Sequence, residues 1–385
     1  MLPPSSDSRP RIYWDEQGQT HSARWRAESV APPKRVVLAD DTMTADTAYR
    51  LACEGTGLLW RGDFQNARQL LQALARRADG KSRKRGKPNK APASPTEAFH
   101  LHRQAQAQRA RTLAMLLLPF DADYTLSLRR APDVRQACVE AWGEPDEPFI
   151  ASMRELLGLI GAHEWRKKGV EIPALGARIH PHYGVFSPVR GEYVRLVAEA
   201  PLPSGATVLA FDIGAGSAVL SAVLAKRGVA QVLATDTDPR ALACAGDNLA
   251  RLGLQEQVAL LQADLFPPGQ AALVVCNPPW LPARPSSPIE QAIYDPDSRM
   301  LRGFLAGLAP HLTPGGEGWL ILSDLAEHLG LRARTELLAW IDAAGLRVAG
   351  RLDARPTHPK AADPTDPLHA ARAAEVTSLW RLAAK

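Results

Sequence analysis

The sequence has no apolar run that approaches the ~20 residues needed for a helix to cross a bilayer. Its first residues, MLPPSSDSRPRIYWDE, lack the apolar core of a secretory signal. It has only four cysteines, and no two of them form a C-x-x-C pair. Cysteines scattered in this way are typical of buried thiols in a reduced compartment rather than of disulfides or zinc ligands. We therefore expect a cytoplasmic protein that does not enter a membrane.

The length of 385 residues and the apolar content of 45% are sufficient for two domains. We place the boundary near residue 168. Helical patterns predominate before it, with no catalytic constellation, so residues 1–168 are predicted to form a mostly helical domain that recognises the substrate. Residues 169–385 form the second domain. The predicted helices of the first domain are Thr44–Glu54, Phe64–Arg77, a helix from the capping box Ser94-Pro95-Thr96-Glu97 to about Leu118, Pro132–Trp142 and Pro148–Lys168.

Positive charge is concentrated in one short segment of the first domain. Between Arg76 and Lys90 stand eight basic residues and one acidic residue, whereas the formal net charge of the whole chain is only +5. One interpretation is a solvated, flexible segment covering about residues 76–93. The other is an electrostatic contact to the phosphates of a nucleic acid. The two interpretations are compatible, because a flexible segment can still attract a polyanion.

The second domain contains four short apolar runs, each of the length of a fully buried strand. Helical patterns at Val219–Arg227 and Pro239–Leu252 separate the first three runs. Strand and helix in alternation indicate an α/β fold with a parallel sheet, and such sheets bind ligands beyond the carboxyl ends of their strands. The runs are Val208–Phe211, Gln231–Thr235, Val258–Gln262 and Ala272–Cys276.

The first two runs end in residues that suit an adenosine-containing ligand. Gly214 and Gly216 allow a tight turn and a close approach of the backbone, and Asp236 follows at the distance expected of a carboxylate that binds ribose hydroxyls. A dinucleotide would favour a third glycine, where this chain has Val219. Asp212 would repel a pyrophosphate but suits an ammonium or a sulfonium. S-adenosylmethionine is therefore favoured over NAD, and a glycine-rich structural turn is the remaining alternative.

The fourth run is followed by Asn277-Pro278-Pro279-Trp280. Two prolines cannot lie within a central strand, and each restricts the residue before it, so the loop is stiff and extended. It presents an amide oxygen and a carbonyl oxygen, both acceptors, to an amino group with two N–H bonds to donate. Trp280 offers a flat face to a planar substrate. The structural alternative is a proline-rich turn capped by a core tryptophan.

These motifs resemble those of the class I S-adenosylmethionine-dependent methyltransferases, and within them the amino-methylating group with an Asn-Pro-Pro-aromatic motif (the "methyltransferase small" and release-factor glutamine methyltransferase types). The resemblance covers roughly Tyr183 to Arg381. It implies a Rossmann-like sheet of seven strands, the last two forming an antiparallel hairpin. It implies contact of Asn277 and Pro278 with the substrate amine. The cofactor contacts that it implies are Asp212, Gly214, Gly216, Asp236 and Asp264, with Asn277 beside them. The group usually has Tyr or Phe where this chain has Trp280.

The resulting hypothesis is an enzyme that transfers a methyl group from S-adenosylmethionine to nitrogen, without a metal ion. An exocyclic amino group of a nucleic-acid base, in ribosomal or other RNA, is the first candidate substrate because of the basic segment. A protein glutamine, as in release factors, is the second. A non-catalytic nucleic-acid-binding module on the same scaffold is a more distant alternative. Phe186, Pro188 and Arg190 line the cofactor site or form a packing hairpin. His180 and His182 share a face but lack a third metal ligand.

Overall fold

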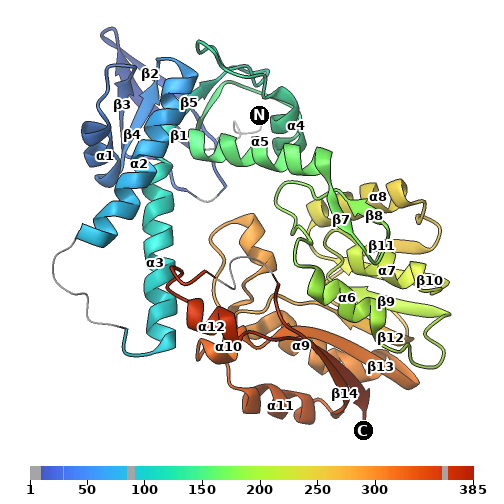
Figure 1. Ribbon diagram of the computed structural model, residues 1–385. Helices are drawn as coiled ribbons and strands as arrows, with labels where there is room; N and C mark the ends of the chain where they lie inside the picture. Colours follow the sequence, from blue (N-terminus) through green and yellow to red (C-terminus); the bar gives the residue numbers. More distant parts are fainter. Residues whose placement is uncertain (1–9, 29, 85–91, 358–362) are drawn as a thin grey trace, which may run out of the picture. The chain divides into compact units, whose positions relative to one another are not determined.

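The computed structural model describes residues 10–28, 30–84, 92–357 and 363–385, with side chains omitted for 81–84. It divides into two compact units (Figure 1). Unit 1 comprises Met1–Ala91 and Leu101–Glu164, and unit 2 comprises Pro92–His100 and Trp165–Lys385. Part of the basic segment, residues 85–91, lies outside the described residues. Its first part is not a loop, since α2 (Phe64–Lys84) extends seven residues beyond the predicted end at Arg77.

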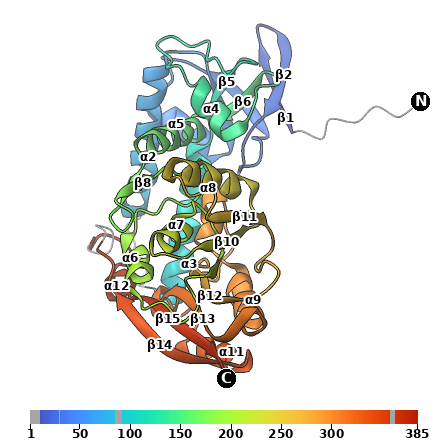
Figure 2. The same ribbon diagram turned by 90° about the vertical axis from the view of Figure 1, so that its right-hand side faces the viewer.

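Unit 1 contains a six-stranded mixed sheet, so the prediction of a mostly helical first domain is wrong. The strand order is β1-β2-β6-β5-β4-β3, with β1 and β2 side by side at one edge (Figure 2). The strands are β1 (Arg11–Glu16), β2 (Gln19–Trp25), β3 (Arg35–Ala39), β4 (Thr56–Trp60), β5 (Leu116–Phe120) and β6 (Phe149–Ser152). The helices are α1 (Ala45–Cys53), α2, α3 (Pro95–Leu113), α4 (Arg135–Trp142) and α5 (Met153–Lys168), of which α3 and α5 extend into unit 2.

Two strands of unit 1, β5 and β6, are short and buried, and the sequence pattern does not separate them from helix. It places the run Leu113–Leu118 at the end of a helix, but α3 ends at Leu113 and β5 begins at Leu116. The helix predicted from Pro148 begins instead at Met153, after the four buried residues of β6. Hydrophobic periodicity cannot distinguish a short buried strand from a turn of buried helix, so pairing with other strands decides.

Unit 2 contains a seven-stranded sheet with the order β11-β10-β9-β12-β13-β15-β14. All neighbouring pairs from β11 to β13 are parallel, and β15 is antiparallel to both β13 and β14. The seven strands and the antiparallel pairing of the last two agree with the prediction. The strands are β9 (Leu209–Ile213), β10 (Gln231–Asp236), β11 (Val258–Gln262), β12 (Ala271–Cys276), β13 (Leu312–Ser323), β14 (Leu346–Ala354) and β15 (Thr377–Ala384).

Helices cover both faces of this sheet. Figure 1 shows α6 (Gly191–Glu199), α7 (Val219–Lys226) and α8 (Pro239–Leu252) on one side and α11 (Arg334–Ala343) on the other. The described part of unit 2 also contains β7 (Val170–Ile172), β8 (Ala177–Ile179), α9 (Arg299–Leu308), α10 (Leu325–His328), α12 (His369–Ala374) and three short 3-10 helices. No helix among the described residues has the length and apolarity to span a bilayer.

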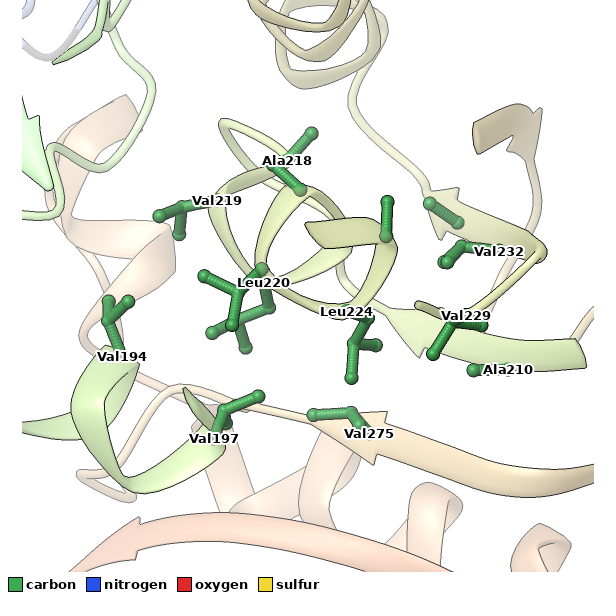
Figure 3. Close-up of a cluster of buried hydrophobic side chains, with 14 of the residues drawn as sticks. Val194, Val197, Ala210, Ala218, Val219, Leu220, Leu224, Val229, Val232 and Val275 are labelled. Carbon is green, nitrogen blue, oxygen red and sulfur yellow. The ribbon is translucent and has the colours of Figure 1, made fainter. Parts of the chain in front are cut away.

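The two-residue period of the central strands creates two cores. In β12, Leu273 and Val275 join the cluster that includes α6, α7 and α8, whereas Val274 and Cys276 join the cluster of α9 and α11. Figure 3 shows Leu224 of α7 close above Val275. Each fully buried aliphatic side chain contributes roughly 1.5–3 kcal/mol. The sheet is therefore held from both faces, and the carboxyl ends of its strands are fixed in position.

A matched pair of glycine substitutions tests this packing. A Cβ at Gly318 of β13 would overlap the side chain of Leu308, whereas a Cβ at Gly246 inside α8 would meet nothing closer than 3.8 Å. We expect Gly318→Ala to destabilise unit 2 by about 1–3 kcal/mol through overpacking. Gly246→Ala should stabilise it by up to about 1 kcal/mol through helix propensity. Equilibrium urea unfolding of both variants measures the difference, and equal stabilities would contradict the packing of α9 on β13.

Candidate functional site

Three of the predicted motifs meet at one edge of the unit 2 sheet. Ile213, the last residue of β9, lies opposite Thr235 on one side and Cys276 on the other. The glycine turn after β9 is therefore flanked by Asp236 at the end of β10 and by Asn277 after β12. The strand order reverses between β9 and β12, which is the position where open parallel sheets bind ligands.

The glycine turn is held in place by its backbone N–H groups. The N–H groups of Gly214 and Ala215 both donate to the carbonyl oxygen of Thr235, at 2.9 and 2.8 Å. Gly214 and Gly216 have φ angles of +81° and +53°, and a Cβ added at Gly216 would meet no atom within 4 Å. The helix α7 follows, and its N-cap residue Ala218 makes no side-chain cap. The turn thus leaves open space beside Gly216 at the start of α7, where a ligand can approach the backbone.

Asp236 connects this turn to the next strand. One carboxylate oxygen accepts from the N–H of Gly216 at 3.0 Å, and the other accepts from the N–H of Asp238 at 2.9 Å. The side chain is half-buried, and burial raises the pKa of Asp236. Each oxygen has a further lone pair, so the fixed carboxylate can still accept two hydrogen bonds from a vicinal diol.

The carboxylate of Asp212, unlike that of Asp236, points into the protein. The residue is 1% exposed, and its carboxylate accepts a 2.5 Å hydrogen bond from the hydroxyl of Ser221 on α7. Burial raises the pKa of Asp212 to about 7, and the Ser221 bond opposes this only in part. The structure shows a contact of Asp212 with α7. A contact with the cofactor stays a prediction.

The buried Asp212 carboxyl should make stability depend on pH. Its pKa is higher in the folded state than in the unfolded state, so the folded state retains a proton that the unfolded state loses above about pH 4. Stability is therefore lost as the pH rises toward 7. We expect Asp212→Asn to be more stable than the parent, with an advantage that grows by about 2 kcal/mol between pH 5 and pH 8. Urea unfolding at both pH values measures it, with Asp342→Asn, whose side chain is 77% exposed, as control.

The loop after β12 holds its own amide oxygen. Asn277 and Trp280 are half-buried, and the indole N–H of Trp280 donates to Oδ1 of Asn277 at 2.9 Å. An indole N–H can only donate, so the oxygen of the amide must face the ring. Pro278 is buried and removes a backbone donor from the loop. The loop can therefore offer oxygen acceptors, of which Oδ1 of Asn277 is already oriented by the ring.

One face of the Trp280 ring carries a guanidinium that sequence reasoning did not connect to it. The Cζ atom of Arg190 lies 5.0 Å from the ring centroid. Arg190 donates to Glu192 at 2.8 Å and to Glu375 at 3.0 Å, and the hydroxyl of Ser323 donates to Glu375 at 2.7 Å. Glu375 is 185 residues from Arg190, so only the fold brings them together. The signal available in the sequence is a carboxylate two residues before the final strand.

The segment that follows the loop folds back along it. Leu281 and Tyr294 form an isolated parallel bridge, and the N–H of Asp295 donates to the carbonyl of Leu281 at 2.8 Å. Asp295 accepts from the N–H groups of Met300 and Leu301 at the start of α9. The 4% exposed Arg332 lies 3.5 Å from the carbonyl oxygen of Trp280, and burial lowers the pKa of Arg332. These contacts attach the loop to α9 and to the segment after α10.

The remaining predicted residues lie outside the group formed by the glycine turn, Asp236 and Asn277, or make contacts unrelated to it. Asp264, two residues beyond β11, is exposed and forms an ion pair with Arg299. His180 contacts the carbonyl of Arg166, and His182 contacts Asp247. No group of three or more potential metal ligands occurs among the described residues. All four cysteines are free, and three of them are buried as expected, whereas Cys53 is exposed.

Comparison with known proteins finds methyltransferases that are similar to part of this chain. Residues 198–278 match the family described as ribosomal protein L11 methyltransferase (PrmA). The chain is 35% identical over 171 residues to a release factor glutamine methyltransferase of Cereibacter sphaeroides, covering 43% of this chain and 57% of the relative. It is 32% identical over 163 residues to a tRNA1(Val) (adenine(37)-N6)-methyltransferase of Shewanella loihica, covering 39% of this chain and 66% of the relative.

A longer match, at 28% identity over 255 residues, is to a ribosomal protein L11 methyltransferase of Pelotomaculum thermopropionicum, covering 64% of this chain and 71% of the relative. The chain spans 57% and 66% of the length of the first two relatives. The relatives differ in the substrates that their names state but share methyl transfer. Over the residues that they share, the chain is therefore similar to class I S-adenosylmethionine-dependent methyltransferases.

Proposed function

We propose that this protein transfers the methyl group of S-adenosylmethionine to a planar amino nitrogen whose lone pair is conjugated. The observation that carries the proposal is the pairing of β9 with β12, which sets the Asn277 loop beside the glycine turn. A cofactor at the turn and an amine at the loop would then be neighbours. Proximity of this kind removes much of the entropic barrier to a bimolecular reaction.

The residues at the turn fit the cofactor. Asp236 is a fixed carboxylate with lone pairs left for the two ribose hydroxyls, and the space above Gly216 is free of side chains. Asp264, at the end of the adjacent β11, is exposed near the expected adenine end. Asp212 would act from behind the turn, through α7, rather than by direct contact.

Bound there, S-adenosylmethionine supplies a methyl carbon on a positively charged sulfur. The protein's part is to orient the acceptor nitrogen. An aryl amine or an amide is a poor nucleophile because its lone pair is delocalised, and Oδ1 of Asn277 with the carbonyl oxygen of Pro278 would accept its two N–H bonds and turn the lone pair toward the methyl carbon. The new N–C bond would form as the C–S bond breaks, the electron pair of the broken bond would remain on sulfur, and the nitrogen would release one proton to water.

An exocyclic amino group of a nucleic-acid base is the first candidate substrate. The excess of positive charge between Arg76 and Lys90 suits an RNA backbone, and one relative is named for a tRNA adenine. In this proposal unit 1 recognises the substrate and unit 2 carries the chemistry. A protein glutamine is the second candidate, favoured by the match to a release factor glutamine methyltransferase, because its side-chain amide is also planar and also has two N–H bonds.

The experiment is transfer of a tritiated methyl group from S-adenosylmethionine to extracts of cells from which the gene is deleted. The labelled product is then divided and digested with nuclease or protease. Label released by nuclease supports the nucleic-acid substrate, and label released by protease supports the glutamine substrate. Absence of label in every fraction, with S-adenosylhomocysteine binding intact, would contradict the proposed activity.

A further inference from the structure

A continuous series of contacts leads from two buried carboxylates to the Asn277 amide. Glu192 and Glu375, 6% and 1% exposed, both accept from the guanidinium of Arg190. That guanidinium lies over the ring of Trp280, and the ring donates to Oδ1 of Asn277. All five residues belong to unit 2. Arg190 and Glu192 lie at the start of α6, Asn277 and Trp280 lie in the loop after β12, and Glu375 lies between α12 and β15.

The last contact in the series depends on tryptophan. An indole presents one N–H in the plane of the ring, and here it meets the amide oxygen at 2.9 Å. A phenylalanine has no donor to replace it, and the hydroxyl of a tyrosine lies at the far end of its ring. The bond uses one of the two lone pairs of Oδ1 and leaves the other for an amine. It also prevents the amide from turning its NH2 group toward that amine, which would set a donor against a donor.

The ring itself is held in place by Arg190. A guanidinium over an indole face is attracted by the quadrupole of the ring, and two carboxylates fix the guanidinium by ion pairs. A planar substrate cannot stack on the face that Arg190 covers. Trp280 also packs against both core clusters of unit 2. These contacts suit a ring that orients its neighbour rather than one that is free to receive a base on either face.

We propose that Trp280 is a positioning residue, which fixes the Asn277 amide for the acceptor amine and is itself fixed by Arg190 through Glu192 and Glu375. The proposal rests on the proposed function, because it assigns Asn277 the substrate amine. It goes beyond that function in giving Trp280 a role that a stacking aromatic does not have. Loss of the indole N–H should lower turnover while leaving cofactor binding intact.

The first test is spectroscopic and needs no substrate. In a ¹H–¹⁵N correlation spectrum of the full chain, the indole signal missing from Trp280→Phe is that of Trp280. In Asn277→Ala we expect this signal to shift and its proton to exchange with deuterium at least tenfold faster. An unchanged exchange rate would overturn the hydrogen bond, whether or not the protein is a methyltransferase.

The second test is kinetic and uses tritiated S-adenosylmethionine with the extract that accepts label from the parent protein. Trp280→Phe should reduce the initial rate about 10- to 100-fold, the loss typical of misplaced reacting groups, with an unchanged KM for S-adenosylmethionine. In the Asn277→Ala background the same substitution should cause no further loss, because Trp280 acts through Asn277. A separate loss in that background would overturn the proposal and favour direct stacking on the substrate.

Trp319→Phe is the matched control in the same unit. Trp319 also donates its indole N–H to a side-chain oxygen, that of Glu317 at 3.0 Å, and also has an arginine over its ring, Arg227 at 5.8 Å. It lies inside β13, where it pairs with Val275 rather than with a residue of the site, so its loss should leave the rate per folded molecule within about twofold of the parent. If the parent labels an extract and Trp280→Phe does so at the same rate, only the positioning role fails. If no extract is labelled by the parent, the proposed function fails instead.

Discussion

Asn277→Ala should reduce methyl transfer about 100- to 1,000-fold and leave the affinity for S-adenosylhomocysteine within about twofold. The size of the loss is that observed when one oriented polar group is removed from a reacting centre. Asn277 follows β12 and is not bonded to the glycine turn or to Asp236 in the contacts that hold them, so cofactor binding should be spared. Initial rates with tritiated S-adenosylmethionine and calorimetric titration with S-adenosylhomocysteine measure the two quantities.

Two further variants control this experiment. Gln270→Ala alters an exposed amide at the other end of the same strand, just before β12, and should behave as the parent does. Asn277→Asp keeps oxygen acceptors for both the indole of Trp280 and the substrate amine, so it should retain more activity than Asn277→Ala. Near-normal transfer by Asn277→Ala would remove the role assigned to this residue. Equal loss of cofactor affinity would indicate that it acts in binding the cofactor.

The fold of unit 2 could be predicted because its local signals agree with one another. The helix predicted over Pro239–Leu252 is found with those bounds as α8, where Asp238 caps the first turn and Gly253 ends the last one in the left-handed region. Caps, proline at the first position and apolar spacing all indicate the same helix. In unit 1, β5 and β6 have no such boundary signals, and they are defined by partners far away in the sequence.

The candidate site could also be predicted only in part: the sequence predicts where its residues lie but not how their side chains are oriented. Gly214, Asp236 and Asn277 each come at the end of an apolar run. The rule that parallel strands end at one edge of a sheet therefore predicts that they lie close together. The sequence does not predict how their side chains are oriented. Asp212 turns inward to Ser221 on α7, and Arg190 turns onto Trp280 because Glu375, from the far end of the chain, holds it there. Spacing along a sequence gives the position of a strand end but not the rotamer of the residue beside it.

Asp236→Asn should weaken the binding of S-adenosylhomocysteine about 10- to 100-fold. The carboxylate accepts from the N–H groups of Gly216 and Asp238, and these bonds fix it at the end of β10. An asparagine keeps one acceptor but must place its NH2 group against one of the two N–H donors. Hydrogen bonds to a charged group contribute about 1.5–3 kcal/mol each, and the substitution weakens the bonds to the ribose and disturbs the glycine turn at the same time.

The pH dependence of binding distinguishes the effect of the negative charge of Asp236 from the effect of the shape of its side chain. Burial raises the pKa of Asp236, so in the free protein its ionised form is lost at a higher pH than for an exposed aspartate. Affinity for S-adenosylhomocysteine should therefore fall as the pH is lowered toward this pKa, and Asp236→Asn should show a flatter profile than the parent. Glu256→Gln, an exposed carboxylate before β11 at the opposite edge of the sheet, should retain the parent profile. Parallel profiles for the parent and Asp236→Asn would assign the titrating group elsewhere. Such a result would place the cofactor away from the ends of β9 and β10. The Asn277 test would remain interpretable, because it measures methyl transfer as well as cofactor binding.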